Sequence, residues 1–488
     1  MEFCMSKYFP VIGLEVHCQL ATQTKMFCGC EVEVNTSPNK HVCPICLGMP
    51  GAMPVPNKKA VEYAIRLGLA LNCEIDLNAM WTRKNYFYPD LPKGYQITQT
   101  GGLPVYDHPI CKKGSLEVTL PDGSIKIVGI TRIHMEEDAG KLVHDLSPEG
   151  SHFDANRCGT PLCEIVTEPD IRSPEEAVLV LQKIKQILEY TGVSNANMEN
   201  GNMRCDGNIS LRTSEDAPFG IRAEIKNLNS FNNLEKALNA EILLQTITLD
   251  AGREVEQCTK RFDTNNNKTI VIRSKEDAHD YRYFPEPDML RLVTASEFVE
   301  KIRKTLPELP DARRKRFVEN YGITPYDAHV LTIDRDVSVW FDTAAKVCKN
   351  PKILANWINS ELLREVKELE DGLAGVKIKP EHLAALVNLI EDNTISGKIA
   401  KQVFAEMFAT GKSPENIIEE KGLVQITDTG AVEAIVREVV LANEGQFLEF
   451  KAGKAALKGF FVGQVMKKSG GKASPGLVNQ ILDKMAAE

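Results

Sequence analysis

The sequence lacks the features that would mark it for a membrane or for export. It contains no uninterrupted apolar run of about 18 residues, so it predicts no membrane-spanning helix. Its first residues, MEFCMSKYFPVIGLEVH, do not have the charged, apolar and small-residue order of a signal peptide. They also lack the Arg/Ser-rich, acid-free character of a transit peptide. We therefore expect a cytoplasmic protein with an unprocessed N-terminus.

An excess of basic charge and a phosphate-binding loop are missing as well. The formal net charge is −9, which excludes a global basic field that would attract nucleic acid or membrane. No G-x-x-x-x-G-K-[S/T] motif occurs, so any bound nucleotide must be held by other side chains. The composition, with 43% hydrophobic and 26% charged residues, is that of folded globular domains. The 488 residues predict roughly two to four of them.

Four of the 13 cysteines form two close pairs. Cys28 and Cys30 are spaced C-x-C, and Cys43 and Cys46 are spaced C-x-x-C, with 12 residues between the pairs. Such pairs can supply four thiolates to a tetrahedral zinc ion. Ordinary buried cysteines remain an alternative, as does a redox C-x-x-C, although no clear βαβ context surrounds it. We interpret loop 28–46 as a structural zinc site, because four thiolates leave no coordination position for a substrate.

The order of predicted strands and helices indicates an α+β protein. Short alternating segments recur through residues 1–295, and two long helices interrupt them, one capped by Ser173 and one closed by Gly252. Regular alternation of strands and helices is absent. We therefore expect a strand-rich, antiparallel domain at 1–295, followed by all-α domains at 296–410 and 411–488.

The last predicted domain carries a run of lysines. Residues 451–472 contain six lysines and no acidic residue. Such a run is most often a solvated helix face, and that alternative stays open. A small helical module with one basic face would also contact the phosphate backbone of a nucleic acid. The candidate nucleic-acid-binding residues are Lys451, Lys454, Lys458, Lys467 and Lys468.

Several predicted strands carry charged side chains on one face only. In VIGLEVHCQL, Glu15 and His17 alternate with Leu14 and Val16, so the acid and the imidazole share a face. The same pattern places on one face Arg132, His134, Glu136 and Asp138; Glu164; Arg204, Asp206 and Asn208; and Arg222, Glu224 and Lys226. A solvent-exposed face with surface ion pairs is the alternative. Four or five such strands in one domain favour a shared site.

Carboxylates gathered on one sheet face repel each other unless a cation lies between them. Oxygen ligands suit Mg²⁺, which bridges to substrate phosphates, and nearby basic groups hold those phosphates. The candidate magnesium ligands are Glu15, His17, Glu164 and either Glu136 or Glu137, of which we favour Glu137. The candidate nucleotide-binding residues are Arg204, Asp206, Arg222 and Lys226.

Long segments throughout the chain carry a family resemblance. They are VIGLEVH, RKNYFYPDLPKGYQI, GITRIHMEEDAGK, PLCEIVTEPDIRSPEEA, MRCDGNISL, EIKNLNSF and DYRYFPEPD, and, near the end, KGLVQITD, GFFVGQVMK and PGLVNQIL. Together they resemble the B subunits of the tRNA-dependent amidotransferase, GatCAB, over nearly the whole chain.

The resemblance implies a fold and a reaction. The family's N-terminal domain is a cradle with a glutamine-synthetase-like sheet, and its tail binds tRNA. Such proteins use ATP and Mg²⁺ to phosphorylate the side-chain carboxylate of Glu-tRNA(Gln) or Asp-tRNA(Asn), and ammonia then displaces the phosphate. The cysteine quartet resembles a Zn²⁺ site that some members have. The resemblance implies catalytic roles for Glu15, His17, Glu136, Glu137, Glu164 and Lys84. Tyr86 and Tyr88 resemble residues near the reaction chamber, with core packing as the alternative for the segment Tyr86–Tyr88.

The source of ammonia must lie in another chain. The sequence has no Gly/Ser-rich amidase signature with a Ser–Ser–Lys triad, and no cysteine glutaminase spacing is evident. The resemblance names an amidase, the A subunit, together with a small C subunit, which would complete a heterotrimer. Two other functions stay open: a free-standing ATP-dependent carboxylate–ammonia ligase, and a zinc-stapled RNA-binding scaffold without catalysis.

Overall fold

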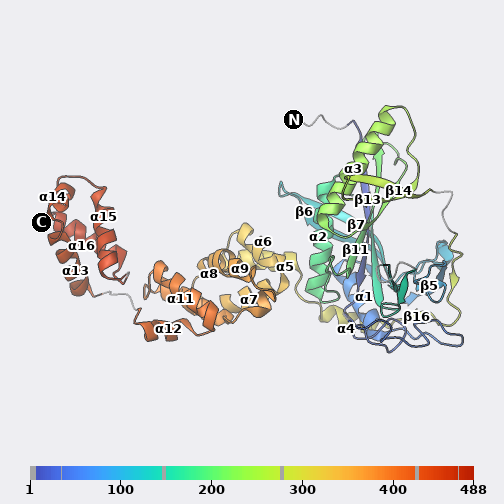
Figure 1. Cartoon of the computed structure of the whole chain (residues 1–488), viewed down its shortest axis with the longest axis horizontal. Helices are drawn as coiled ribbons and strands as arrows, with labels where there is room; N and C mark the ends of the chain where they lie inside the picture. The colour runs from blue at the N-terminus through green and yellow to red at the C-terminus, as the bar shows by residue number, and fades with distance from the viewer. Residues whose placement is uncertain are drawn as a thin grey trace. The chain divides into compact units, whose positions relative to one another are not determined.

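The computed structural model divides into two compact units, Met1–Leu309 and Pro310–Glu488 (Figure 1). It describes residues 7–33, 36–144, 150–274, 280–423, 428–470 and 472–487. The expectation about the N-terminus therefore falls largely outside the described residues. None of the described helices has both the length and the apolar character needed to cross a bilayer.

A 12-stranded sheet forms the framework of the first unit. Its main path is β14-β13-β12-β11-β1-β10-β7-β5-β4-β15, and β6 joins β7 to β2. Every pair is antiparallel except β12 with β13, so the predicted α+β class with an antiparallel sheet is confirmed. The strands of this sheet are β1 (Phe9–Gln19), β2 (Glu74–Ile75), β4 (Thr82–Asn85), β5 (Tyr95–Thr98), β6 (Cys111–Thr119), β7 (Ile125–Glu137), β10 (Pro161–Thr167), β11 (Met203–Arg212), β12 (Ala223–Leu228), β13 (Cys258–Asp263), β14 (Lys268–Ser274) and β15 (Phe284–Pro285). Two small pairs join β3 (Asn78–Ala79) to β16 (Leu292–Val293) and β8 (Lys141–Val143) to β9 (His152–Asp154).

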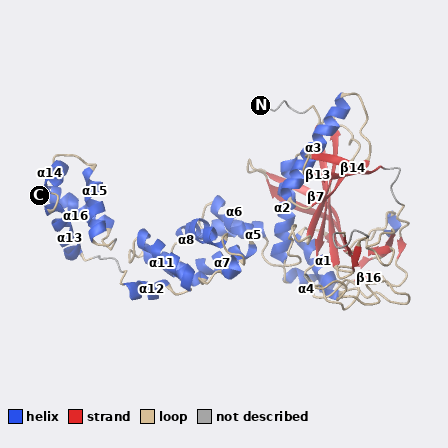
Figure 2. Cartoon of the chain, viewed as in Figure 1, coloured by secondary structure: helices blue, strands red, loops and turns tan. Residues whose placement is uncertain are grey.

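Three helices cover one face of this sheet (Figure 2). They are α1 (Lys58–Ala70), α2 (Pro174–Thr191) and α3 (Phe231–Asp250). Leu14 and Val16 of β1 are buried in the core with these helices. Because side chains alternate along a strand, Glu15 and His17 point to the opposite face. The sheet therefore separates an apolar core from a polar face.

The ends of the two long helices follow the predicted capping residues. The Ser173 side chain accepts a hydrogen bond from Glu176 N, and Gly192 ends α2 with a positive φ of 67°. The Glu176 carboxylate accepts from Arg172 N, one residue before the position that a capping box would use. Gly252, with φ of 67°, closes α3.

The first unit extends further along the chain than the predicted boundary at residue 295. Helix α4 (Ser296–Lys304) packs on α1, and its residues Val299 and Ile302 belong to the core of the sheet unit. Its apolar face is thus buried before the chain enters the second unit at Pro310.

The second unit is helical and contains two separate clusters of buried residues. The first runs from Phe317 to Ile418 and the second from Val432 to Leu482. Ile417 and Ile418 lie in the first cluster, so the predicted boundary at 410/411 falls before the helix that completes this core. The helices are α5 (Pro310–Tyr321), α6 (Pro325–Ile333), α7 (Arg335–Ala345), α8 (Pro351–Trp357), α9 (Leu363–Val366), α10 (Pro380–Glu391), α11 (Gly397–Thr410), α12 (Pro414–Lys421), α13 (Thr429–Leu441), α14 (Glu444–Lys451), α15 (Leu457–Lys468) and α16 (Pro475–Ala487). Short turns of other helix types are η1 (Pro104–Tyr106, in the first unit), η2 (Ile358–Leu362) and η3 (Gly372–Gly375).

Candidate active site and zinc site

The register of three central strands brings distant residues into one row. On the polar face, His17 of β1 lies opposite Glu164 of β10, and Glu164 lies opposite His134 of β7. Glu136 follows His134 on the same face of β7, opposite Thr98 of β5. The alternation seen in the sequence thus becomes a single site, in which β1 meets two strands more than 100 residues further along the chain.

These four side chains form a histidine–carboxylate cluster, defined by His17, His134, Glu136 and Glu164. His17 Nε2 lies 3.1 Å from Glu164 Oε2 and 4.0 Å from Glu136 Oε2. His134 Nε2 lies 3.0 Å from Glu136 Oε1 and 3.4 Å from Glu164 Oε2. The His134 side chain is fully buried, whereas that of His17 is 24% exposed, so the cluster opens to solvent at His17.

The charges of this cluster depend on one another. Burial disfavours the charged imidazoles, but the neighbouring carboxylates outweigh it and raise the pKa of both His17 and His134 to about 9. Burial also opposes ionisation of Glu164, but the two histidines hold its pKa well below the ordinary value. The pKa of Glu136 is lowered too, chiefly by His134 against the cost of burial. Two buried acids therefore require positive charge beside them.

The donor set of this cluster fits a hard divalent cation. One ligand atom each from His17, Glu136 and Glu164 lies within 4.8 Å of the others. Carboxylate oxygens suit Mg²⁺ or Mn²⁺, and a cation there would balance the acids. The buried His134 Nδ1 has no hydrogen-bond partner among the described residues.

Glu137 does not belong to this cluster, contrary to the predicted magnesium set. It follows Glu136 directly, so it points to the opposite side of β7. There its carboxylate accepts hydrogen bonds from Lys93 Nζ and, at 3.0 Å, from Ile97 N. The structure brings Glu136 to His17 and Glu164 instead.

Glu15, also predicted with the first set, lies in a second group. Glu15, Asp206 and Glu224 form a carboxylate cluster in which one oxygen from each lies within 4.8 Å of the others. Lys226 Nζ lies 2.8 Å from Asp206 Oδ2 and 2.7 Å from Glu224 Oε1. Burial and the field of Glu164 raise the pKa of Glu15. The two clusters are neighbours, because Glu15 and His17 stand two residues apart on β1.

Lys84 approaches the site from β4 among aromatic side chains. Its Nζ lies 4.9 Å from the ring centre of Tyr281 and 5.7 Å from that of Tyr86. Burial lowers the pKa of Lys84, but the field of Glu136 and weaker contributions from the tyrosines together raise it. Phe87 and Tyr88 are largely exposed, which rules out core packing for these two residues.

The remaining predicted nucleotide-binding residues lie on the same face toward the edge of the sheet. Arg204 lies opposite His17, and its Nη2 donates to Asp138 Oδ2 at 3.1 Å. Arg222 is exposed just before the start of β12. Arg204 therefore already has an anionic partner, whereas Arg222 has none among the described residues.

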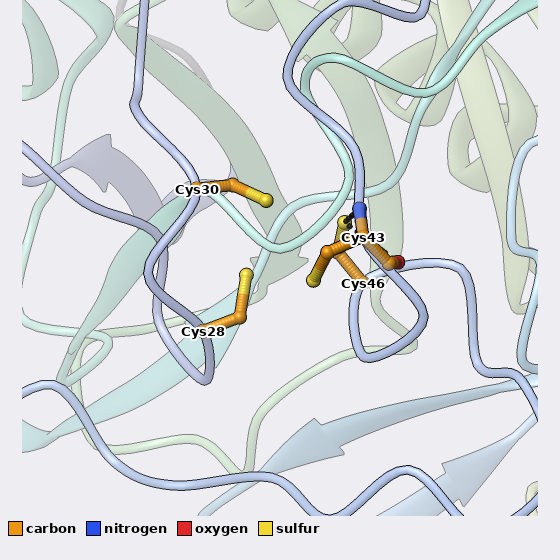
Figure 3. Close-up of side chains that lie close together, drawn as sticks. All are labelled: Cys28, Cys30, Cys43 and Cys46. Atoms are coloured by element: carbon orange, nitrogen blue, oxygen red, sulfur yellow. Dashed lines mark hydrogen bonds between the residues drawn. The ribbon is translucent and has the colours of Figure 1, made fainter.

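The four predicted zinc ligands converge from two loop segments (Figure 3). The sulfur atoms of Cys28, Cys30, Cys43 and Cys46 lie within 4.8 Å of one another. Cys43 N donates to Cys46 Sγ at 3.2 Å, as in a metal-binding knuckle. The pKa of Cys46 is lowered to about 5, first by the hydrogen bond with Cys28 and then, against burial, by Cys43 N and Lys25.

A buried lysine supports the interpretation of these cysteines as thiolate ligands. Lys25 is fully buried, and its Nζ lies 3.7 Å from Cys46 Sγ and 2.6 Å from the His41 carbonyl oxygen. A buried ammonium needs an anionic partner. The cysteine quartet fits zinc. Four thiolates around Zn²⁺ carry a net negative charge, and the positive charge of Lys25 would complement it.

Comparison with known proteins agrees with this geometry. A family model described as the GatB/GatE catalytic domain matches residues 10–300, and one described as the GatB domain matches residues 339–485. The chain belongs to the GatB/GatE family. The family match spans the sheet, both clusters and the cysteine quartet, so the predicted resemblance is confirmed.

Similar proteins cover the whole chain. A protein of Carboxydothermus hydrogenoformans, named as the B subunit of aspartyl/glutamyl-tRNA(Asn/Gln) amidotransferase, is 53% identical over 99% of this chain and 100% of its own length. Proteins of the same name from Syntrophotalea carbinolica and Brevibacillus brevis are 51% and 50% identical over 98% and 99% of both chains.

The GatB domain match includes the candidate nucleic-acid-binding lysines of residues 451–472, which together form the lysine surface of the tail. Some of these lysines form ion pairs in the structure and others do not. Lys454 and Lys458 lie 2.8 Å from Glu449 and 2.7 Å from Asp483, and Lys468 pairs with Glu438. Lys451 and Lys467 have no ion pair among the described residues. The available positive charge is therefore smaller than the sequence suggested.

Three further residues of the family's catalytic domain were not predicted as site residues. His134 was visible in the alternation of GITRIHMEED, and Glu224 in that of IRAEIKNL, but neither stood out from an ordinary polar strand. Tyr281 lies in the segment DYRYFPEPD, where no spacing relates it to Lys84. Strand pairing reveals the place of His134 and Glu224, and a hydrogen bond of 2.9 Å from Asn85 N to the Tyr281 carbonyl oxygen places Tyr281 beside β4.

Proposed function

We propose that this chain activates the side-chain carboxylate of Glu-tRNA(Gln), Asp-tRNA(Asn) or both with ATP, as the B subunit of a glutamine-dependent amidotransferase. The carboxylate attacks the γ-phosphorus of ATP; the bond to the ADP oxygen breaks and an acyl phosphate forms. Ammonia then attacks the acyl carbon, the C–O bond breaks, and phosphate leaves with the proton that the nitrogen loses. The products are Gln-tRNA(Gln) or Asn-tRNA(Asn), ADP and phosphate.

One observation carries the proposal: two adjacent groups of acids on the polar face of the sheet, each able to hold a divalent cation. A carboxylate becomes a good electrophile only after its oxygen becomes a leaving group, and phosphoryl transfer depends on positioning and on stabilising charge. Mg²⁺, when bound, supplies the positive charge that draws electron density from the phosphates.

The side chains have distinct roles in this reaction. His17, Glu136 and Glu164 would hold one cation, and Glu15, Asp206 and Glu224 would hold a second. Lys226 reduces the negative charge of the second group, which lessens repulsion of the incoming phosphates. His134, which contacts Glu136 and Glu164 from the buried side, fixes the orientation of both carboxylates.

Lys84 is suited to hold the aminoacyl carboxylate. It carries its charge among Tyr86, Tyr281 and Tyr283, and burial raises the pKa of both Tyr86 and Tyr283, so their hydroxyls stay neutral. An aromatic surround limits water, which would otherwise hydrolyse the acyl phosphate. Zn²⁺ would hold loop 28–46 and take no part in the chemistry.

Ammonia would come from a partner. We propose that this chain forms a heterotrimeric complex with an amidase, the A subunit, together with a small C subunit, and that the complex binds a charged tRNA. Lys451 and Lys467 of the tail are the candidate contacts to the tRNA backbone. Because the substrate is a charged tRNA, we place the reaction in the cytoplasm.

ATP hydrolysis by the assembled complex tests the proposal. We expect hydrolysis to be stimulated by Glu-tRNA(Gln) or Asp-tRNA(Asn) and not by free glutamate or aspartate. Stimulation by the free amino acid would favour the free-standing ligase. Formation of amidated tRNA without ATP consumption would overturn the proposal, and the absence of both reactions would favour the RNA-binding scaffold.

A further inference from the structure

A polar hollow adjoins the carboxylate cluster at the edge of the sheet. It has a volume of about 160 Å³ and lies where β12, β13 and β14 run side by side. Arg222, Glu224, Thr259 and Arg273 contribute to its lining. Pockets that enclose a whole small-molecule ligand usually measure about 300–1,000 Å³, so this hollow suits only part of one.

The strand register connects the hollow to the proposed cation site. Arg273 of β14 lies opposite Thr259 of β13, and Thr259 lies opposite Glu224 of β12. Thr259 Oγ1 donates to Glu224 Oε2 at 3.1 Å. Glu224 is also a member of the carboxylate cluster, so the hollow and the cluster share a wall. Arg273 stands two strands from Glu224, about 10 Å along the sheet.

The hollow carries unused positive charge. Neither the Arg222 nor the Arg273 side chain has a hydrogen bond or ion pair with another residue in the described part of the chain. By contrast, Arg83 binds Glu286 through two hydrogen bonds of 2.7 and 2.8 Å. The acid of the hollow, Glu224, is already paired with Lys226. Two guanidinium groups without a partner among the described residues, beside a carboxylate already paired with lysine, favour an anion that accepts bidentate hydrogen bonds.

We propose that Arg222 and Arg273 bind the two phosphates that remain in ADP, which the reaction does not transfer. The inference rests on the proposed function, because ATP is the anion that must meet the neighbouring cation site. The γ-phosphate belongs near the cations and the acyl acceptor, so the rest of the phosphate chain runs toward the edge of the sheet. The size of the hollow agrees with phosphate groups and excludes the whole nucleoside triphosphate.

Steady-state kinetics of the assembled complex test this assignment. The variants are Arg222→Gln, Arg273→Gln and the double variant, with Arg253→Gln as the matched control. Arg253 is an exposed arginine in the loop before β13 and does not line the hollow. We expect each substitution in the hollow to raise KM for ATP by about tenfold, as for loss of a charge-assisted hydrogen bond. Arg273→Lys should recover only part of this, because lysine keeps the charge and loses the planar fork.

A change in KM alone separates phosphate binding from chemistry. We expect kcat to stay within about twofold, because the lost contact binds ATP equally in the ground state and in the transition state. The KM for the mischarged tRNA should stay unchanged. Calorimetric binding of MgADP to the full chain gives a second measurement, because ADP retains only the phosphates in question. Its affinity should fall in the hollow variants and not in the control. Thermal unfolding confirms that each variant is folded.

Two results would overturn the inference. If KM for the tRNA rises and KM for ATP does not, the arginines bind an RNA phosphate. If neither KM nor the affinity for MgADP changes, they bind no substrate phosphate. The failure of the proposed function looks different, because the wild-type complex itself would then not consume ATP during amidation.

Discussion

The polar face of the sheet and the lysine surface of the tail are both rich in charged side chains but differ in burial. Glu136 and Glu164 have side chains that are 4% and 12% exposed. In the tail, the side chains of Lys454 and its partner Glu449 are 68% and 55% exposed. A buried charge costs free energy of folding unless it is paired. An exposed charge costs almost none. A functional role is therefore strongly indicated in the sheet and only weakly in the tail.

The same difference predicts which substitutions matter. A buried acid in a cluster cannot be removed without leaving its histidine partners uncompensated. An exposed lysine loses only a screened interaction with solvent or with a phosphate. Equal losses of function on substitution in the sheet and in the tail would contradict this difference.

Glu164→Gln should have the largest effect. Glu164 contacts both His17 and His134, so its loss removes a proposed cation ligand and the charge that orients both imidazoles. We expect transamidation by the assembled complex to fall by about 100- to 1,000-fold, comparable to the removal of a group that stabilises charge in a transition state. Glutaminase activity of the proposed amidase partner should remain largely intact, as should ATP-independent tRNA binding.

Glu168→Gln is the matched control for this variant. Glu168 follows β10, is exposed, and accepts a hydrogen bond of 2.8 Å from Thr131. Its substitution should leave transamidation unchanged. Equal losses in the two variants would show that burial in the cluster does not distinguish functional acids.

A large part of this site was predictable from the sequence, because alternation places side chains on faces. Alternation placed Glu15 and His17 on the polar face with Glu164, and the cysteine spacing predicted the four cysteines whose sulfur atoms converge. Alternation places Glu136 and not Glu137 on the face of His134, but it cannot say whether that face meets His17 and Glu164, since that depends on how the strands pair. Glu136 was resolved from Glu137 only by the pairing of β7 with β5 and β10.

The boundaries of the domains were harder to predict for a related reason. Helices α4 and α12 look like parts of the domains that follow them in sequence. Their apolar residues, such as Val299 and Ile417, are buried in the cores that precede them. A helix has the same sequence pattern whichever core it covers, so only tertiary packing assigns it.

Lys25→Met extends the comparison to a buried lysine. The Lys25 ammonium lies next to Cys46 Sγ, so its loss removes the positive charge beside the proposed zinc thiolates. We expect zinc affinity, measured by competition with a chelator, to fall about 10- to 100-fold, as for other groups that support metal ligands. Lys40→Met, which changes an exposed lysine of loop 28–46, should retain wild-type affinity. Tighter or unchanged zinc binding in Lys25→Met would contradict this role.

Asp342 in the second unit is an intermediate case. It accepts hydrogen bonds from Arg316 at 2.8 Å and Tyr321 at 2.6 Å, and these groups lower its pKa despite burial. Its pKa in the folded chain is therefore below that in the unfolded chain. The resulting stability is present above the ordinary aspartate pKa and is lost as the pH falls toward the folded value.

Asp342→Asn should lower the free energy of unfolding of the second unit by about 1 kcal/mol at pH 7, after allowance for solvent screening. The difference from wild type should shrink as the pH falls from about 5 to about 3. Denaturant unfolding of the full chain, followed by tryptophan fluorescence, to which Trp340 and Trp357 of the second unit contribute beside Trp81 of the first, measures both. A difference that stays constant over this range would mean that the Asp342 charge contributes nothing, and exposed Glu370→Gln should show no difference at either pH.

The smallest effect is expected in the tail, where unpaired and paired lysines can be compared directly. Lys451 and Lys467 are unpaired among the described residues, so each is available to a phosphate, whereas Lys454 and Lys458 must first leave Glu449 and Asp483. In tRNA binding by the full chain, Lys451→Gln with Lys467→Gln should weaken affinity several-fold. It should also reduce the slope of log affinity against log salt by about 0.7–0.9 for each phosphate that is no longer neutralised. Lys454→Gln with Lys458→Gln should change both quantities less, because the lysines removed were already neutralised. An equal change in the two double variants would mean that the ion pairs do not persist in solution, and no change in either would place the tRNA elsewhere on the molecule.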